Sequence, residues 1–143
     1  MNGKKTIMVF DAQGGGLGRQ LISSIRKEMP DVRIIATGTN SAATGAMLKA
    51  GADEGATGEN AVCVVSRKAD YIIGPIGMVI ADAMLGEITP AMAAAIAQSP
   101  ATRIMIPFSS CDNYIAGVSD FTTGRLLADA VRQLKYYLTE MSR

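Results

Sequence analysis

The sequence contains no histidine and no tryptophan, and only 5% of its 143 residues are aromatic. Without histidine the chain lacks the commonest general base and the commonest metal ligand of proteins. The two cysteines, Cys63 and Cys111, are too few for a disulfide framework. We therefore expect reduced thiols, a cytoplasmic location and no metal site.

Long apolar runs and long basic runs are also missing. No stretch approaches the roughly 18 apolar residues of a membrane span, and the first residues do not have the pattern of a secretory signal. Fourteen Lys and Arg against thirteen Asp and Glu give a net charge of +1. This balance lacks the electrostatic footprint of a nucleic-acid-binding protein. The expected partner is therefore neither a membrane nor a nucleic acid.

The remaining composition is that of an ordinary globular protein, with 48% hydrophobic and 19% charged residues. The length suits one domain, residues 1–143. Short β-branched runs alternate with longer segments of helical period, which predicts an α/β fold with a mostly parallel sheet. Strands are predicted at residues 6–10, 32–36, 71–73, 103–106 and 114–118.

The last two predicted strands lie too close together for a parallel crossover, which needs at least about 10–12 residues. The sequence therefore predicts a hairpin with an antiparallel edge strand. Helices are predicted at residues 17–29, at 42–50 with Asn40 or Ser41 as the cap, up to about residue 85, and from Thr89 and Pro90 to 98. For residues 57–69 a helix is favoured, although 62–65 would also suit a strand.

A long helix is predicted over residues 122–141 because its apolar side chains form one sustained stripe. The stripe consists of Leu126, Leu127, Ala130, Val131, Leu134, Tyr137, Leu138 and Met141. Packing on the sheet is the default for such a stripe. If part of it stays exposed, Tyr137, Leu138 and Met141 would suit a contact between copies. A homo-oligomer, with a dimer favoured, would also wall the crevice of so small a domain.

The most informative feature is a glycine-rich turn between the first strand and the first helix. A strand that enters a helix through glycines exposes backbone N–H groups at the positive end of that helix, where a phosphate binds. The predicted binding residues are Gln13, Gly14, Gly15, Gly16, Leu17 and Gly18. The alternative is that these glycines only let the helix pack closely on the sheet.

No named fingerprint fits this turn completely. Arg19 stands where G-x-G-x-x-G would have its third glycine, and Ala12 stands where a short-chain dehydrogenase has its first. The Lys-Ser/Thr end of a Walker A loop is missing. The turn therefore predicts a phosphate-bearing ligand without naming it.

Two further segments are expected at the same edge of the sheet. Thr39 and Asn40 follow the second strand, where an NAD site usually has a carboxylate. Because none stands there in the sequence, NADP is favoured over NAD, while a mononucleotide or a phosphorylated metabolite fits equally. Asn40 would alternatively be only a helix cap. Gly74, Pro75 and Gly77 are expected to form the other wall of the crevice.

Catalytic candidates are weak. Asp11 is the best placed, at a strand end, and Glu59 is the second; Asp82 and Glu87 flank a further turn. Each is more typically a cap or a solvated charge. Cys111 has no histidine to activate it. Binding without catalysis, as a sensor or an assembly subunit, is therefore weighed against a small oxidoreductase or phosphotransfer enzyme.

Five segments together resemble an uncharacterised bacterial domain-of-unknown-function family of short Rossmann-like proteins. They are residues 11–18, 38–40, 55–61, 74–77 and 85–90, and the resemblance covers most of the chain up to about Val118. It implies a nucleotide-binding-like α/β fold and supplies no activity or catalytic residue. The expected architecture is a three-layer Rossmann-like sandwich with about five strands, an antiparallel edge strand and a long C-terminal helix.

Overall fold

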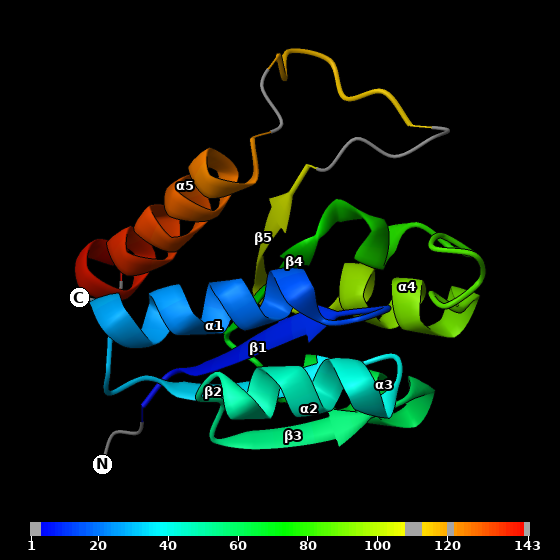
Figure 1. Ribbon diagram of the computed structural model, residues 1–143, viewed down its shortest axis with the longest axis horizontal. Coiled ribbons are helices and arrows are strands. Elements are labelled where there is room, and N and C mark those ends of the chain that lie inside the picture. Colours follow the sequence, from blue (N-terminus) through cyan, green and yellow to red (C-terminus); the bar gives the residue numbers. More distant parts are fainter. Residues whose placement is uncertain (1–3, 108–112, 120–121, 142–143) are drawn as a thin grey trace.

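The structure is a computed structural model that describes residues 4–107, 113–119 and 122–141 (Figure 1). Five parallel strands form one sheet in the order β3-β2-β1-β4-β5. The strands are β1 (Thr6–Asp11), β2 (Arg33–Gly38), β3 (Glu54–Thr57), β4 (Tyr71–Pro75) and β5 (Thr102–Ile106). This is the order of the first five strands in a doubly wound dinucleotide-binding sheet.

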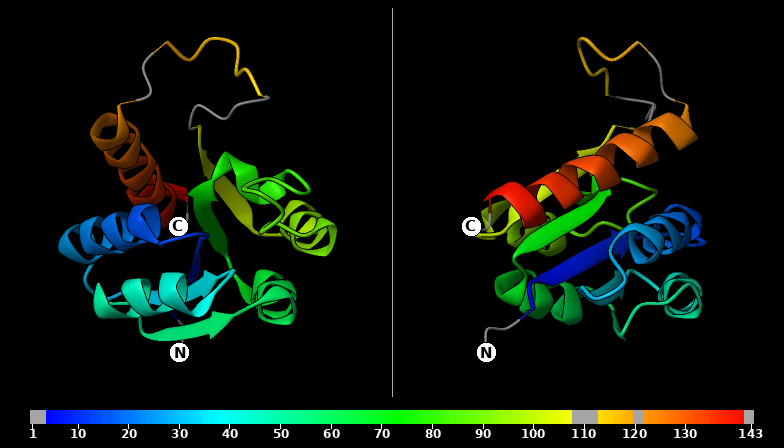
Figure 2. Two further views of the ribbon diagram at one scale, coloured as in Figure 1. Left: turned by 45° about the vertical axis from the view of Figure 1, so that its right-hand side comes forward. Right: turned by 90° about the vertical axis from the view of Figure 1, so that its left-hand side faces the viewer.

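Helices cover both faces of this sheet, as the two views in Figure 2 show. One face carries α1 (Gly16–Glu28), α2 (Ser41–Lys49) and α5 (Thr123–Tyr136), which continues into the π-helical turn η2 (Tyr137–Met141). The other face carries α3 (Glu59–Lys68) and α4 (Pro90–Gln98). A short 3₁₀ helix, η1 (Ile76–Val79), follows β4. The three-layer α/β architecture expected from the sequence is therefore present.

The central strand β1 feeds two separate cores. Ile7 and Val9 pack under α1 and α5, whereas Met8 and Phe10 pack under α3 and α4. Successive side chains of a strand point to opposite faces, so a strand buried on both sides is apolar throughout. This burial explains why residues 7–10 of β1 form a continuous hydrophobic run.

Two predicted helix caps are confirmed. The Asn40 side chain accepts a hydrogen bond from Ala43 N (2.9 Å) at the start of α2. Thr89 accepts one from Met92 N (3.1 Å) at the start of α4, with Pro90 in the first turn. The helix favoured for residues 57–69 is also confirmed, as α3, and the strand alternative for that stretch is wrong.

The predicted antiparallel edge is wrong, because all five strands are parallel. Residues 114–118 form turns and irregular backbone with Gly117 at φ 86°, not a strand. The sheet still has five strands, because one strand was not predicted from the sequence: β3, which pairs with β2 at the edge opposite to β5. Its sequence, Glu-Gly-Ala-Thr, has no hydrophobic run, because an edge strand this short buries little.

A second correction concerns the β4–α4 connection (residues 76–89), for which a helix was predicted up to about residue 85. Only η1 is helical there, and Asp82, Met84, Leu85 and Gly86 all have φ between 58° and 89°. Such left-handed residues cannot continue a right-handed helix. The connection instead folds back on itself, with Asp82 N donating to Ile88 O (2.7 Å).

The apolar stripe of α5 packs on this chain's own sheet, as the default predicted. Its buried members are Leu127, Ala130, Val131 and Leu134. Tyr137 continues the stripe and stacks on Tyr71 of β4, with ring centroids 5.8 Å apart. The side chain of Met141 lies outside the described part of the chain, so the contact between copies stays a prediction.

Candidate functional site

The glycine-rich turn lies at the carboxyl ends of the strands, directly after β1. Gly15 N donates to Ala12 O (3.0 Å), which closes the turn, and α1 begins at the next residue. Gln13 and Gly15 have φ of 51° and 75°, so the chain reverses through two left-handed residues. The strand–turn–helix arrangement predicted from the sequence is therefore present.

Asp11 holds this turn together. Its side chain is buried, and its Oδ1 accepts from Ala12 N (2.8 Å) while Oδ2 accepts from Gly18 N (2.7 Å). Burial raises the pKa of Asp11, although hydrogen bonds from the backbone of Gly18, Ala12 and Leu17 act in the opposite direction. Both carboxylate oxygens are thus engaged by backbone amides, which is the geometry of a structural cap.

Two of the four glycines are required by packing. A Cβ on Gly15 would lie 2.8 Å from the Cα of Ala43, and one on Gly18 would lie 2.5 Å from the sulfur of Met47. These glycines let α1 approach α2 closely. For them, the alternative explanation given by the sequence, close helix packing, is sufficient.

The other two glycines face open space. A Cβ on Gly14 or Gly16 would meet no atom within 4 Å. In the part of the chain that the structure describes, their amide N–H groups reach no protein acceptor. Both line a cavity of about 230 Å³ whose walls are residues 11–17, Pro75 and Met84. Unengaged amides at a helix N-terminus, beside a hollow, are the elements of an anion site.

The predicted second wall is only partly present in this cavity. Pro75 lines it, but Gly74 is packed against β1, where a Cβ would lie 2.7 Å from Phe10 O. Gly77 belongs to η1 and lies near the side chain of Met84. Of the three, Pro75 alone therefore faces the hollow.

Glu87 is the residue that the sequence did not connect to this site. Its Oε1 accepts from Thr39 Oγ1 (2.6 Å), from Gln13 N (2.8 Å) and from Asn40 Nδ2 (3.3 Å). These hydrogen bonds, the one from Thr39 above all, lower the pKa of Glu87. Glu87 reaches the end of β2 from a segment more than 45 residues away along the chain, so no local pattern could have revealed it.

The expectation that no carboxylate lies at the end of β2 is therefore wrong. Thr39 and Asn40, predicted to face a ligand phosphate, are held by Glu87 instead. Asn40 also caps α2 and donates to Gln13 O (2.9 Å). Its role as a helix cap, left open by the sequence, is thus observed. The reason for favouring NADP over NAD no longer applies.

Glu59, the second catalytic candidate, is not among the described residues that line the cavity. Glu59 is exposed in the first turn of α3. Cys63 lies on α3, where its sulfur is 3.9 Å from Ala91 O, and Cys111 is outside the described residues. Within residues 4–107, 113–119 and 122–141, no group of three or more acidic or cysteine residues is placed to hold a metal ion.

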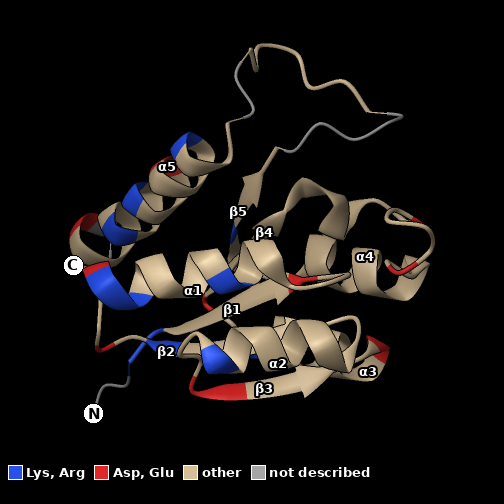
Figure 3. Cartoon of the chain, viewed as in Figure 1, with Lys and Arg blue, Asp and Glu red and all other residues tan. Residues whose placement is uncertain are grey.

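Charge is distributed unevenly around the sheet. The right-hand end of the view in Figure 3, where β1 and β3 end, shows acidic rather than basic segments. None of the described residues that line the cavity is a Lys or an Arg. An anion bound there would therefore be held by backbone amides and the α1 dipole rather than by a cationic side chain.

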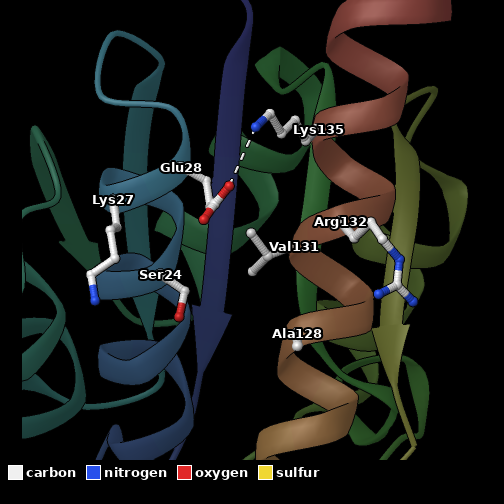
Figure 4. Close-up of a pocket in the computed structure, with 7 residues that line it drawn as sticks. All are labelled: Ser24, Lys27, Glu28, Ala128, Val131, Arg132 and Lys135. Atoms are coloured by element: carbon white, nitrogen blue, oxygen red, sulfur yellow. Dashed lines mark hydrogen bonds and ion pairs between the residues drawn. The ribbon is translucent and has the colours of Figure 1, made fainter.

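A larger hollow of about 390 Å³ lies between α1 and α5 (Figure 4). Val131 points into it, and the Lys135–Glu28 ion pair (3.3 Å) spans it. Both ion-pair side chains are about half exposed, so this is a solvated seam between two helices. It lies at the C-terminal half of α1, away from the glycine-rich turn.

None of the helices in the described residues is long and apolar enough to cross a membrane. Among solved structures, one similar chain is a dodecameric FMN-dependent UbiX-like decarboxylase from Escherichia coli O157:H7. The two chains share 16% identity at a TM-score of 0.46, over 92% of this chain and 94% of the other.

The comparison with curated proteins gave no match. The family model "Domain of unknown function (DUF3842)" matches residues 6–139, which is nearly the whole chain. The resemblance noted in five segments of the sequence therefore corresponds to a family relationship, and the chain belongs to the DUF3842 family.

Proposed function

We propose that this protein binds a phosphate-bearing nucleotide at the glycine-rich turn, with a dinucleotide of the NAD(P) type as the leading candidate. The observation that carries the proposal is the pair Gly14 and Gly16. Their amides are unengaged, their Cα atoms face open space, and both line the cavity at the start of α1. Packing does not account for these two glycines, whereas close approach of a phosphate does.

The size of the cavity supports binding of only part of such a ligand. Pockets that enclose a drug-sized molecule measure roughly 300–1,000 Å³, and this cavity measures about 230 Å³. It suits the phosphates, while the nucleoside would extend along the open carboxyl edge of the sheet. Because β2 and β4 flank β1 in the sheet, Thr39 and Asn40 lie on one side of the turn and Pro75 on the other. We expect the two ends of the ligand to extend toward these residues.

Binding without catalysis by Asp11 or Glu59 is the form we favour. Both carboxylate oxygens of Asp11 accept backbone hydrogen bonds, and Glu59 does not line the cavity. A sensor or an assembly subunit therefore fits better than an oxidoreductase or phosphotransfer enzyme that uses these two acids. Homo-oligomerisation belongs to this proposal, because a second copy would wall the open edge.

The proposal is tested by a thermal-shift screen of the purified chain with NAD, NADP, their reduced forms, ATP, FMN and S-adenosylmethionine. A ligand at about 100 times its dissociation constant stabilises the folded state by roughly 2.7 kcal/mol. This corresponds to an increase in Tm of several degrees, roughly 9 degrees, for a domain of this size. We expect such a shift with at least one nucleotide.

Gly16→Glu and Gly16→Gln form a matched pair for the same screen. A Cβ on Gly16 would meet no atom within 4 Å, and the two side chains are nearly equal in size, but only the glutamate places a negative charge against the phosphate. Gly16→Glu should lose the shift, and Gly16→Gln should retain more of it. The proposal fails if no nucleotide shifts the wild-type protein, or if Gly16→Glu binds as well as Gly16→Gln does.

A further inference from the structure

Glu87 places a negative charge at one end of the proposed nucleotide site. It comes from the β4–α4 connection and reaches the end of β2, where three donors converge on its Oε1. The three donors belong to two different segments, the turn after β1 and the residues after β2. Glu87 therefore occupies the point at which these two segments meet.

The donors that Glu87 engages are the ones a phosphate at this position would need. The hydroxyl of Thr39, the amide of Asn40 and the backbone N–H of Gln13 already serve a carboxylate. In the described ranges, no Lys or Arg forms an ion pair with Glu87. The hydrogen bonds also lower its pKa, so the group is ionised at neutral pH. A second anion beside it would be repelled without a cation to compensate.

A hydroxyl group would be received differently. An ionised carboxylate only accepts hydrogen bonds, and each of its oxygens has more than one acceptor position. All three recorded hydrogen bonds use Oε1, and among the described residues none uses Oε2. A sugar hydroxyl can donate to that oxygen, whereas a phosphate at pH 7 has no suitable donor.

We infer that Glu87 is a specificity-determining residue, which selects nucleotides with a free ribose 2′-hydroxyl at the end of β2 and rejects those with a 2′-phosphate. This inference rests on the proposed function. It predicts that the protein prefers NADH to NADPH. The carboxylate that other dinucleotide sites place directly after the second strand is supplied here by the connection after β4.

The test is titration calorimetry of the wild-type protein and Glu87→Gln with NADH and with NADPH. The wild type should bind NADH at least about tenfold more tightly than NADPH, because like charges placed close together are strongly disfavoured. Glu87→Gln should bring the two dissociation constants to within about threefold, mainly by strengthening NADPH binding. Glu59→Gln removes an exposed carboxylate at the same edge of the sheet and should leave the preference unchanged.

The wild-type ratio tests the inference even if Glu87→Gln does not fold, and circular dichroism checks its folding. Equal affinities in the wild type would overturn the inference. A Glu87→Gln variant that binds both dinucleotides more tightly by the same factor would also overturn it. Glu87 would then block the site for both ligands without discriminating between them. Binding of another nucleotide alone would overturn this inference and leave the proposed function standing. Absence of any nucleotide binding would overturn both.

Discussion

The four glycines of the turn after β1 have different tasks, although the sequence presents them as one cluster. Gly15 adopts φ 75° and lies against Ala43, and Gly18 lies against Met47. Gly14 and Gly16 have neither constraint. The first pair serves the fold, and the second pair leaves backbone amides accessible from the cavity.

This division predicts that glycine-to-alanine substitutions at Gly15 and at Gly16 differ in their effect on stability. Gly15→Ala adds a Cβ 2.8 Å from the backbone of α2 and strains a left-handed residue, so it should lower the free energy of unfolding by about 1–3 kcal/mol. Gly16→Ala has room and helical geometry, so its effect should stay within about 0.5 kcal/mol. Urea unfolding followed by circular dichroism measures both values. Equal losses in the two variants would contradict the assignment of tasks.

At the scale of elements, the β4–α4 connection holds three of the four non-glycine residues with positive φ in the described part of the chain. Asp82, Met84 and Leu85 are non-glycine residues with φ near 60°, and the side chain of Leu85 is fully exposed. Each such residue costs conformational energy that the surrounding contacts must offset. Buried Met78 and Ile88 anchor the connection at both ends. Glu87 ties it to the turn after β1 and to the end of β2.

The tie through Glu87 predicts a specific pH dependence. Its pKa is lowered in the folded protein from an ordinary value of 4.5. The stability it contributes is therefore fully present above about pH 4.5 and is lost as the pH falls through the folded pKa. The difference in free energy of unfolding between wild type and Glu87→Gln should be largest near pH 6 and shrink toward pH 3.

Burial is the main cause that shifts the pKa of Asp11 in the opposite direction, upward from 3.8, and the charge of Glu87 across the turn adds to this shift. Because the pKa of Asp11 is raised in the folded protein, its contribution to stability falls as the pH rises from about 3.8 through the folded pKa. Because Asp11 is present in both proteins, its direct contribution largely cancels in the difference. Glu59→Gln serves as the control for removal of a carboxylate. A gap between wild type and Glu87→Gln that stays constant from pH 6 to pH 3 would show that the charge of Glu87 is not what stabilises the connection.

At the scale of the whole molecule, the two cores are joined by a single sheet. β1 and β4 contribute alternate side chains to each core, so that Ile7 and Ile73 face α1 and α5 while Met8 and Ile72 face α3 and α4. Neither layer of helices has a core without these strands. The two layers should therefore not unfold separately.

This arrangement predicts one cooperative unfolding transition. Far-ultraviolet circular dichroism reports all the helices, whereas tyrosine emission, free of any tryptophan signal, includes the stacked pair Tyr71–Tyr137 between β4 and the end of α5. Both signals should give the same urea midpoint and the same slope, as expected for a two-state domain. An earlier transition in tyrosine emission would indicate that α5 detaches before the sheet unfolds.

The sequence by itself predicted the elements whose residues carry a local signal. The apolar run of β1, the caps Asn40 and Thr89 and the stripe of α5 each follow from spacing within one segment. The glycine-rich turn was also located correctly between β1 and α1. These features depend on residues that are only a few positions apart, so the sequence pattern of a single segment is enough to predict them.

Only the tertiary structure decided what depends on distant segments. β3 is a strand because β2 lies beside it, since its own four residues have no hydrophobic pattern. The glycines separate into packing and open positions because α2 crosses close to two of them. Glu87 reaches Thr39 and Asn40 because the β4–α4 connection folds across the sheet edge. Contacts between segments this far apart in the sequence are determined by the packing of the whole chain. The local periodicity of the sequence therefore does not predict them.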